Sequence, residues 1–249
     1  MIDRLKREKD FHNKRFDDNS ILRNHANKYY AVNKHVEDRY VDIVAKHCKE
    51  KKVLEYGCGS GSQSLQWLEL DAKLIGIDIS SKGIEKAKEK ISKTNYNAEY
   101  YIMDAEKTKF NDNVFDLVIG TGIIHHLNIL NSYKEISRIL NDDGHAIFIE
   151  PLGHNPLINL YRKLTPEMRT EDEHPLKIND IKLMEQYFHD VHIEYYSLFV
   201  LFAVPIRKLW FFKNIYNILK IVDEFVLRFP FIRRYAWTIL IHAHRPKNN

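Results

Sequence analysis

Cysteine, long apolar runs and charge of one sign are all scarce in this sequence. Its 249 residues include two cysteines, Cys48 and Cys58. Two cysteines cannot form a disulfide framework, and these two lack the spacing of a metal-binding motif. We therefore expect reduced thiols, no metal site and a cytoplasmic protein.

Export and membrane-spanning signals are not visible either. The first ten residues are charged throughout, whereas a secretory signal needs an apolar stretch of about 7 to 15 residues. The longest apolar run near the C-terminus covers residues 198–206, about half of the ~20 residues that span a bilayer. We expect no segment that crosses a membrane by itself.

The charge balance bears on the partners. Lys and Arg number 38 and Asp and Glu 34, which leaves a net charge of +4. Binding along a nucleic-acid duplex needs a far denser positive charge, so nucleic acid is not an expected partner. With 44% hydrophobic and 29% charged residues, the chain has the composition of a globular protein and can bury a core unaided.

Glycine and proline divide the chain. All nine glycines lie between Gly57 and Gly153, and all seven prolines lie from Pro151 onward. Because these residues punctuate turns and loops, the change near residue 150 predicts a boundary. We expect an N-terminal helical segment or lid at 1–50, a ligand-binding core at 51–150 and a specialising, substrate-side region at 151–249.

Short apolar runs alternate with helical patterns, which is typical of a parallel sheet with crossover helices. Ser80 or Ser81 is expected to cap a helix whose Ile84, Ala87 and Ile91 recur at helical spacing, and a later helix is expected at 181–187. The predicted fold class is α/β, a doubly wound, mostly parallel seven-stranded sheet with an α-helical insertion before the last strand. The strands are expected at 52–56, 73–77, 99–103, 115–119, 145–149, 191–196 and 237–241.

The insertion at about 199–233 has an amphipathic pattern. Polar residues recur every three or four positions from Lys213 to Arg228, and basic residues mark its edges. The expected apolar face is made of Phe212, Ile215, Leu219, Val222 and Val226. Three interpretations stay open: a cap over an apolar acceptor, a homodimer surface, and a helix pair that rests on a membrane.

The stretch from Val53 to Gly61 carries the most chemical information. An apolar strand runs into glycines at alternate positions, Gly57, Gly59 and Gly61. Glycine lets the backbone approach a ligand without a Cβ clash and supplies N–H donors at the start of the next helix. A dinucleotide site needs its third glycine one residue later, where this chain has serine. Glu55 before the turn would repel a pyrophosphate but suits a cationic ligand.

Acidic residues end the next two strands. Asp78, 17 residues after Gly61, can accept hydrogen bonds from both hydroxyls of a ribose, whether the ligand is a dinucleotide or a cationic nucleoside. Asp104 can accept from an adenine amino group while the backbone of Ala105 reads the ring. With the glycine turn and the segment Gly120-Thr-Gly-Ile-Ile-His-His-Leu127 after the fourth strand, these signals resemble the class I S-adenosylmethionine-dependent methyltransferases. The resemblance covers about residues 50–150.

The resemblance implies a Rossmann-like methyltransferase fold with S-adenosyl-L-methionine as cofactor. The methionyl part would lie over the glycines, the ribose on Asp78 and the adenine against Asp104 and Ala105. Glu55 would contact or order the region around the amino acid moiety, or alternatively cap backbone N–H groups. The expected cofactor-binding residues are Glu55, Gly57, Gly59, Gly61, Asp78, Ile79, Asp104, Ala105, Thr121 and Tyr30.

The segment after the fourth strand bears on the acceptor. Methyltransferases of this family that act on nucleobase amino groups usually carry Asn or Asp followed by Pro-Pro and an aromatic residue there, and those that make 5-methylcytosine need a cysteine in that region. This chain has Gly-Thr-Gly-Ile and no cysteine there. The resemblance therefore implies a small-molecule acceptor, such as a metabolite, sugar or lipid-linked precursor.

His125 and His126 are the expected catalytic residues. A hydroxyl acceptor must lose a proton on methylation, and a neutral imidazole titrates near the working pH. One of the two adjacent side chains is expected to face the site, and His125 is favoured; satisfying backbone groups at a helix start is the alternative. We expect O-methylation, with N- or C-methylation of a quinone-like or sterol-like acceptor as the alternative.

Further acceptor contacts are expected downstream and near the N-terminus. The fifth strand leads into Glu150 and His154, and a polar, proline-bounded loop follows. A solvated surface loop is the alternative for each of these residues, and core packing is the alternative for the tyrosines. The expected substrate-side residues are Tyr29, Glu150, His154, Arg169 and His174, with Glu173 on the same loop and Tyr29 or Tyr30 closing the site.

The sequence is also compatible with two functions other than methyl transfer. An NAD-dependent oxidoreductase is disfavoured by the shortened glycine spacing and by Glu55. A non-catalytic partner subunit would keep the cofactor pocket but methylate nothing. The fold alone cannot choose an acceptor, because one scaffold of this type hosts many substrates.

Overall fold

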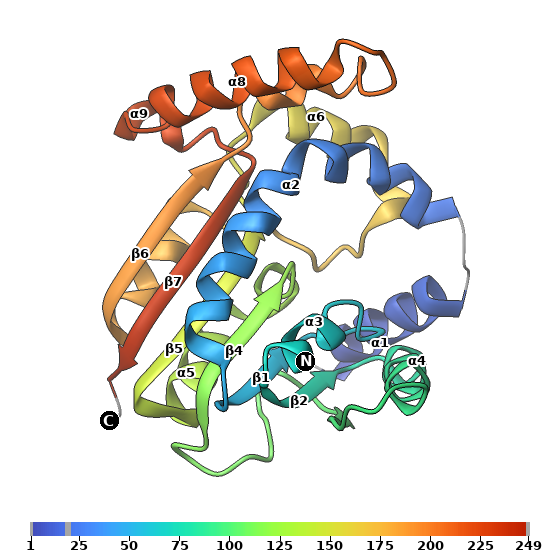
Figure 1. Cartoon of the computed structure of the whole chain (residues 1–249), viewed down its shortest axis with the longest axis vertical. Coiled ribbons are helices and arrows are strands. Elements are labelled where there is room, and N and C mark those ends of the chain that lie inside the picture. The colour runs from blue at the N-terminus through green and yellow to red at the C-terminus, as the bar shows by residue number, and fades with distance from the viewer. Residues whose placement is uncertain (1, 18–20, 248–249) are drawn as a thin grey trace.

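The computed structural model describes residues 2–17 and 21–247, except for the side chains of residue 2 and residues 21–30. Its centre is one seven-stranded sheet with the strand order β3-β2-β1-β4-β5-β7-β6 (Figure 1). The strands are β1 Lys52–Tyr56, β2 Lys73–Asp78, β3 Glu99–Ile102, β4 Phe115–Thr121, β5 Leu140–Pro151, β6 Phe188–Tyr196 and β7 Thr238–Pro246.

Strands β1 to β5 pair in parallel, and β7 runs antiparallel to both β5 and β6. The predicted α/β class, the seven strands and the mostly parallel sheet are confirmed. Parallel strands covered on both faces read as continuous apolar runs, and β4 shows this with Leu117, Val118 and Ile119 all fully buried.

Helices cover both faces of the sheet. On one face lie α2 (Ile21–Cys48), α3 (Ser64–Glu69) and α4 (Ser81–Ser92), whose apolar residues share a core with Leu117, Ile147 and Leu240. On the other face lie α5 (Ile129–Ile139) and α7 (Ile178–Met184), which pack on Phe148 and Ile241. Neighbouring residues of a strand point to opposite faces, so Ile147 and Phe148 belong to different cores.

Several expected boundaries shift. The Ser80 hydroxyl accepts from the Gly83 N–H at 3.0 Å and begins α4, as predicted. The helix expected at 181–187 instead spans Ile178–Met184, because the Asp180 side chain accepts from the Lys177 N–H at 2.7 Å and fixes an earlier start. Strands β5, β6 and β7 are longer than their apolar runs, since strand pairing continues through polar residues such as His145, Asp190 and His244.

The helical insertion before β7 is confirmed. It contains the 3₁₀ turn η3 (Val200–Ala203), α8 (Phe212–Val226) and α9 (Pro230–Arg233). The single apolar face expected for α8 is wrong at Ile215, which is 37% exposed and continues a second apolar face with Ile218 and Ile221. The helix is held by buried Asp223, whose carboxylate accepts backbone N–H groups of residues 198–200.

The first helix, α1 (Ile2–Asp17), packs against α4 rather than against α2. The Asn13 side chain accepts from the Ser80 hydroxyl at 2.8 Å, and the Lys86 ammonium donates to the Phe16 carbonyl. These contacts place α1 beside the carboxyl ends of β1 and β2. No helix in the described part of the chain is long and apolar enough to span a bilayer.

Candidate functional site

A pocket of about 660 Å³ opens at the carboxyl ends of β1, β2 and β4, where ligands bind in open α/β sheets. This volume lies within the usual range for small-molecule sites. Both α1 and the polar loop after α6 (Pro156–Leu164) contribute to its walls. Of the predicted cofactor residues, those that line it are Glu55, Gly57, Gly59, Asp78, Ile79, Asp104, Ala105 and Thr121.

The glycine turn brings the backbone to the pocket surface. Gly57 and Gly59 line the pocket and have φ values of +74° and +53°, a conformation that other residues rarely adopt. A Cβ on Gly59 would lie 2.8 Å from the Phe16 ring. Gly61 was expected to contact the cofactor, but it does not line the pocket. Its missing Cβ leaves room for Ala87 of α4, 3.1 Å away.

Asp78 stands at the end of β2 and is held by backbone donors. Its Oδ2 accepts from the Gly59 N–H and its Oδ1 from the Ser80 N–H, both at 2.8 Å. Each carboxylate oxygen keeps a second acceptor position for a ligand hydroxyl. The same contact ties the glycine turn of β1 to the end of β2.

Glu55 is a buried acid at the other end of the glycine turn. The Ser64 hydroxyl donates to its carboxylate, and the residue also lines the pocket. Burial raises the pKa of Glu55 to about 7. A buried carboxyl group that titrates near neutrality favours a cationic ligand group beside it.

The end of β3 supplies a small residue beside an acid. Asp104 accepts from the Glu106 N–H at 2.9 Å, and burial raises its pKa. The hydroxyl of buried Tyr56 donates to the Ala105 carbonyl, which fixes the backbone here. Asp78 and Asp104 end neighbouring strands and line one pocket, as sugar and base contacts of one nucleoside require.

His125 lies on the 3₁₀ turn η1 (Ile124–His126) after β4. Its Nδ1 is 2.7 Å from Oε2 of Glu150. The Glu150 side chain is fully buried, and its Oε1 also accepts from the N–H groups of Ile123 and Ile124 at 2.9 and 2.8 Å. Glu150 was expected to contact the acceptor, but it does not line the pocket. Its carboxylate instead holds the η1 turn and the His125 ring from behind.

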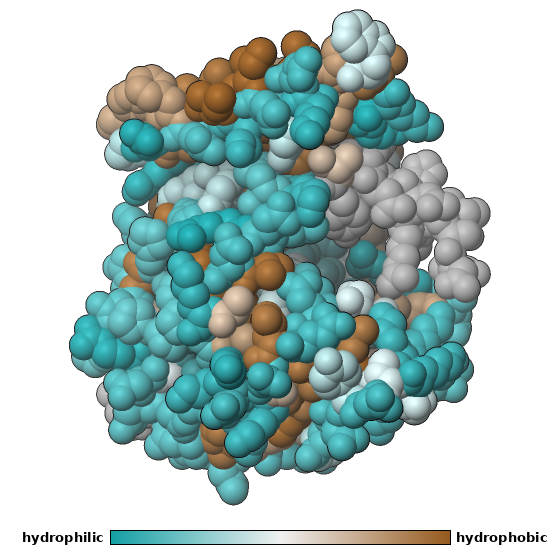
Figure 2. Space-filling model, in the orientation of Figure 1, coloured by the Kyte–Doolittle hydropathy of each residue, from teal (hydrophilic) through white to brown (hydrophobic). Residues whose placement is uncertain are grey.

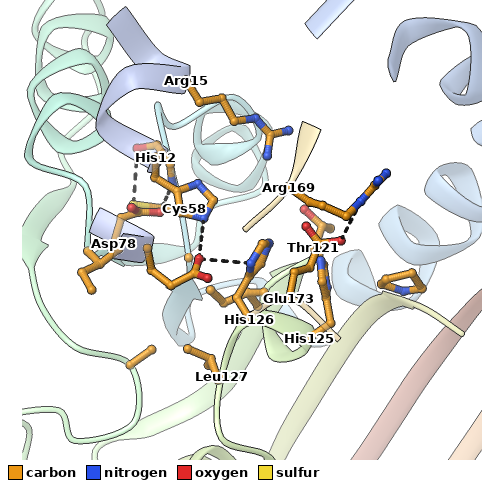
Figure 3. Close-up of a pocket in the computed structure, with 18 of the residues that line it drawn as sticks. His12, Arg15, Cys58, Asp78, Thr121, His125, His126, Leu127, Arg169 and Glu173 are labelled. Atoms are coloured by element: carbon orange, nitrogen blue, oxygen red, sulfur yellow. Dashed lines mark hydrogen bonds and ion pairs between the residues drawn. The ribbon is translucent and has the colours of Figure 1, made fainter. Parts of the chain in front are cut away.

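Both adjacent histidines line the pocket, although one was expected to do so. His126 Nδ1 lies 3.2 Å from Oε2 of Glu8, and His12 Nε2 lies 3.4 Å from the same oxygen (Figure 3). Burial alone would raise the pKa of Glu8, but its contacts with His12, His126 and Thr170 lower it overall. Helix α1 thus faces the two histidines across the pocket.

The polar loop after α6 reaches the same histidines. Glu173 lies close to His125 and His126 and pairs with Arg162 at 2.6 Å. Burial alone would raise the pKa of Glu173, but the neighbouring positive charges lower it overall. Arg169 also lines the pocket, and its guanidinium donates to the Arg162 carbonyl at 2.7 Å.

Two predicted acceptor contacts lie elsewhere. His174 is exposed, with Nδ1 3.0 Å from the Asp172 carbonyl oxygen, and His154 accepts from the Ile178 N–H at 3.4 Å. Neither lines the pocket, because the loop turns Glu173 inward and the next residue outward. The side chains of Tyr29 and Tyr30 lie outside the described residues.

The contribution of α1 was not predicted residue by residue. Its pocket-lining residues recur at three- or four-residue spacing, which is the signal of one helix face. They are Arg4, Leu5, Glu8, His12, Arg15 and Phe16. Among the described residues, none between 199 and 233 lines this pocket, so its lining does not support the interpretation of the insertion as a cap over the acceptor.

Histidine and acidic side chains form two groups in this pocket that bring ligand atoms within 4.8 Å of one another. One is Glu8, His12 and His126, and the other is His125, His126 and Glu173. In the first group, the ion pairs of His12 and His126 with Glu8 account for the approach. The site therefore combines a cradle for a nucleoside at one end with a histidine and acid cluster at the other.

Comparison with known proteins agrees with this geometry. Residues 54–148 match the methyltransferase domain family. The ubiquinone biosynthesis O-methyltransferase of Pelagibacter ubique is 32% identical over 119 residues, which cover 47% of this chain and 49% of that protein. A malonyl-[acyl-carrier protein] O-methyltransferase of Geobacter sulfurreducens is 28% identical, over 58% of this chain and 52% of that protein.

Solved structures share the fold at low sequence identity. Phosphoethanolamine N-methyltransferase 2 of Haemonchus contortus, in complex with S-adenosyl-L-methionine, matches with a TM-score of 0.61 and 18% identity, over 84% of this chain and 53% of that one. Geranyl diphosphate C-methyltransferase of Streptomyces coelicolor A3(2) matches with a TM-score of 0.59 and 12% identity, over 85% and 80%. The chain spans about half the length of the curated relatives it matches. The predicted resemblance to class I methyltransferases is confirmed for the core of the chain.

Proposed function

We propose that this chain, whose residues 54–148 form a methyltransferase domain, transfers the methyl group of S-adenosyl-L-methionine to a hydroxyl oxygen of a small-molecule acceptor. The main support for this proposal is that the His125 ring lies on the wall of the pocket with Nδ1 2.7 Å from the Glu150 carboxylate. The matched relatives named as O-methyltransferases support the reaction class.

The residues present fit the cofactor. Two glycines leave the floor of the pocket without Cβ atoms, buried Glu55 suits the amino group, and Asp78 and Asp104 can hold the ribose and the adenine. When bound, the cofactor supplies a methyl group on a positively charged sulfur. Ionised Glu55 favours a cation over a pyrophosphate.

The chain's own part in the reaction is to orient the acceptor and take its proton. Because Nδ1 of His125 is held by Glu150, its Nε2 is the nitrogen left to accept the hydroxyl proton. On transfer of the methyl group from sulfur to the hydroxyl oxygen, that proton would move to Nε2, and the Glu150 carboxylate would stabilise the resulting imidazolium. Positioning of the acceptor in line with the methyl group accounts for much of the acceleration in such a displacement.

Amine or carbon acceptors are the alternative. The structural neighbours include enzymes named as N- and C-methyltransferases, so the fold does not choose among them. A buried carboxylate behind a histidine favours oxygen, because a neutral amine can attack the methyl group before it loses a proton and needs no base for that step. We also place the chain in a reducing, cytoplasmic compartment, which its two buried free thiols support.

The test begins with calorimetry. We expect S-adenosylhomocysteine to bind with one site per chain. Reduced nicotinamide adenine dinucleotide should not bind. Transfer of labelled methyl is then measured against a panel of phenols, sugars, carboxylic acids, amines and prenyl compounds, and label on an oxygen is expected. Binding of reduced nicotinamide adenine dinucleotide without binding of S-adenosylhomocysteine would overturn the proposal. Binding of S-adenosylhomocysteine with no labelled product in cell extract would point to a non-catalytic subunit.

A second part of the proposal concerns the surface formed by α8 and α9. Residues 199–234 contain seven Lys or Arg and two Asp or Glu, a net +5, so the rest of the chain carries (38 − 7) − (34 − 2) = −1. The positive charge of the whole chain is thus concentrated in this segment. Apolar side chains are exposed beside these charges, with Trp210 at 90% and Phe231 at 85% (Figure 2).

We assign this α8–α9 surface to an anionic membrane rather than to a second copy of the chain. Two identical basic surfaces would repel each other, whereas anionic headgroups attract Lys and Arg and admit aromatic side chains. The helix α6 lies on the same side of the molecule as α8 (Figure 1). Its Leu157 and Leu160 are exposed, and it also lines the pocket through Ile158. A lipid or lipid-linked acceptor fits this arrangement.

A further inference from the structure

Five histidines gather on the side of the sheet that α2 covers, far from the pocket. His145 lies on β5, His242 and His244 on β7 and His192 on β6, all on the face of the sheet that α2 covers. The last turn of α2 supplies His47. His145 is six residues before the pocket end of β5, which is about 20 Å along the strand. This group therefore belongs to no part of the proposed methyl-transfer site.

Three of these rings come close enough to share one ligand. Nδ1 of His145 and Nε2 of His242 are 3.0 Å apart, and the His47 and His145 ring centres are 4.0 Å apart. One nitrogen from each of the three lies within 4.8 Å of the other two. In a tetrahedral zinc site, with Zn–N bonds of about 2.0–2.1 Å, the nitrogens are roughly 3.3 Å apart.

We propose that His47, His145 and His242 bind one zinc-type divalent metal ion, with water in the fourth position. Sequence spacing could not predict this site, because the three residues are 97 or more positions apart and form no ligand motif. Imidazole is a borderline donor that suits zinc, copper and nickel over magnesium or calcium. A tetrahedral site with three nitrogen ligands and one water is within the known range for zinc.

The protonation state of the rings favours a metal. Burial, followed by the charges of neighbouring histidines, lowers the pKa of His145 and of His242 to about 4. Burial also lowers the pKa of His47. Neutral imidazoles keep the lone pair that a metal needs, and binding at pH 7 then requires no proton to be released from this pair.

The surroundings suit three ligands rather than four. Nε2 of His244 lies 3.5 Å from Asp190, which holds its ring beside the site, with the His145 and His244 ring centres 5.3 Å apart. His192 is 71% exposed and turns toward Glu194. A metal at the three rings would join the end of α2 to β5 and β7, so its effect would be to hold α2 against the sheet.

The experiment uses full-length protein without a histidine tag, first stripped with a chelator. Titration with zinc chloride in a calorimeter should show one site, and cobalt(II) should give the visible absorption of a tetrahedral nitrogen site. His145→Ala or His47→Ala should weaken zinc binding at least about 100-fold, more than is usual for loss of an outer-sphere partner. His192→Ala, on the same face, is the matched control and should bind as the parent does.

Binding of S-adenosylhomocysteine separates this site from the pocket. The His47→Ala protein should keep its affinity for that ligand, which also shows that it is folded. Equal zinc binding by the parent and by a His47→Ala/His145→Ala/His242→Ala variant would overturn the proposal. So would loss of zinc binding on substitution of His126, because the metal would then sit among the pocket residues.

Discussion

Oε2 of Glu150 lies 2.7 Å from Nδ1 of His125, while the other oxygen of the same carboxylate holds the backbone of the η1 turn. One fully buried acid thus fixes both the loop that carries the histidine and the orientation of its ring. A buried charge is stable only when such partners satisfy it. The arrangement leaves Nε2 as the ring nitrogen that Glu150 does not hold, on a histidine that lines the pocket.

The first prediction concerns His125. His125→Ala should lower turnover of the acceptor found in the label-transfer screen by about 10²–10⁴-fold, the usual contribution of a general base. The affinity for S-adenosylhomocysteine should stay within about twofold, because this side chain holds no part of the cofactor in our proposal. Steady-state kinetics and calorimetry measure the two quantities separately.

Its control is His174→Ala, which removes an exposed histidine that does not line the pocket. That variant should keep parental turnover. Glu150→Gln should lower turnover too, and should shift its pH profile, since an amide cannot stabilise an imidazolium as a carboxylate does. If His125→Ala turns over acceptor at the parental rate, the histidine is not the base.

The second prediction concerns Asp78. Asp78→Ala should weaken binding of S-adenosylhomocysteine by roughly 10- to 150-fold, because hydrogen bonds to a charged group are worth about 1.5–3 kcal/mol each. Asp78→Asn, which keeps the shape and one acceptor oxygen, should lose less. Glu85→Ala removes an exposed acid from the neighbouring helix α4 and serves as the charge control. Equal affinity for parent and Asp78→Ala would remove the ribose assignment.

Most of the residues expected to bind the cofactor line one pocket. The acids and glycines among them stand at or just after the ends of β1, β2 and β3, so local pattern and strand order together locate them. Gly61 was expected under the methionyl part of the cofactor, and spacing alone could not show that it lies outside the pocket lining. Its missing Cβ faces Ala87, a contact that exists only in the folded chain.

The acceptor half depends on contacts between distant segments. Glu8 meets His126 from 118 positions away, and Glu173 meets His125 across a turn of the loop that exposes its neighbour His174. Glu150 ends a strand at the pocket edge, but tertiary hydrogen bonds turn it inward. Period and composition carry no information on such pairings, which explains why the positions of Glu150, His154 and His174 outside the pocket lining were not predicted.

The third prediction is a pH dependence that originates at Glu55. Because burial raises the pKa of this carboxyl to about 7, the group is protonated in much of the unliganded protein below that pH. The cationic amino group of the ligand prefers the carboxylate, so affinity for S-adenosylhomocysteine should rise between pH 6 and 8, by up to about tenfold per pH unit. Calorimetry across this range should show a flat profile for Glu55→Gln.

The stability of the folded protein should change with pH in the opposite direction to the ligand affinity. Folded Glu55 keeps its proton up to about pH 7, whereas the ordinary value is 4.5, so the folded state binds more protons between these two values. The free energy of unfolding should therefore fall as the pH rises through this window, and Glu55→Gln should remove that decline. A parental affinity that does not change with pH would contradict the contact between Glu55 and the amino group.

The last prediction concerns the α8–α9 surface. The chain should sediment with vesicles of phosphatidylglycerol and phosphatidylcholine at low salt, and much less with phosphatidylcholine alone. Reversing three exposed charges, as Lys208→Glu, Arg228→Glu and Arg234→Glu, should weaken this binding by at least about 100-fold, since each basic residue near an anionic surface contributes about 1 kcal/mol. Phe225→Ser with Phe231→Ser should weaken it without changing the charge.

Tryptophan fluorescence gives an independent measure of the same contact. Trp210 is 90% exposed while Trp67 is fully buried, so vesicles should shift the emission of Trp210 to the blue and Trp210→Phe should abolish that shift. A dimer is the competing outcome: the chain would sediment as two copies without lipid, and the phenylalanine variants would make it a monomer. Because the surface carries a net +5, raising the salt should strengthen such a dimer but weaken a membrane contact, so the salt dependence of the two signals separates them.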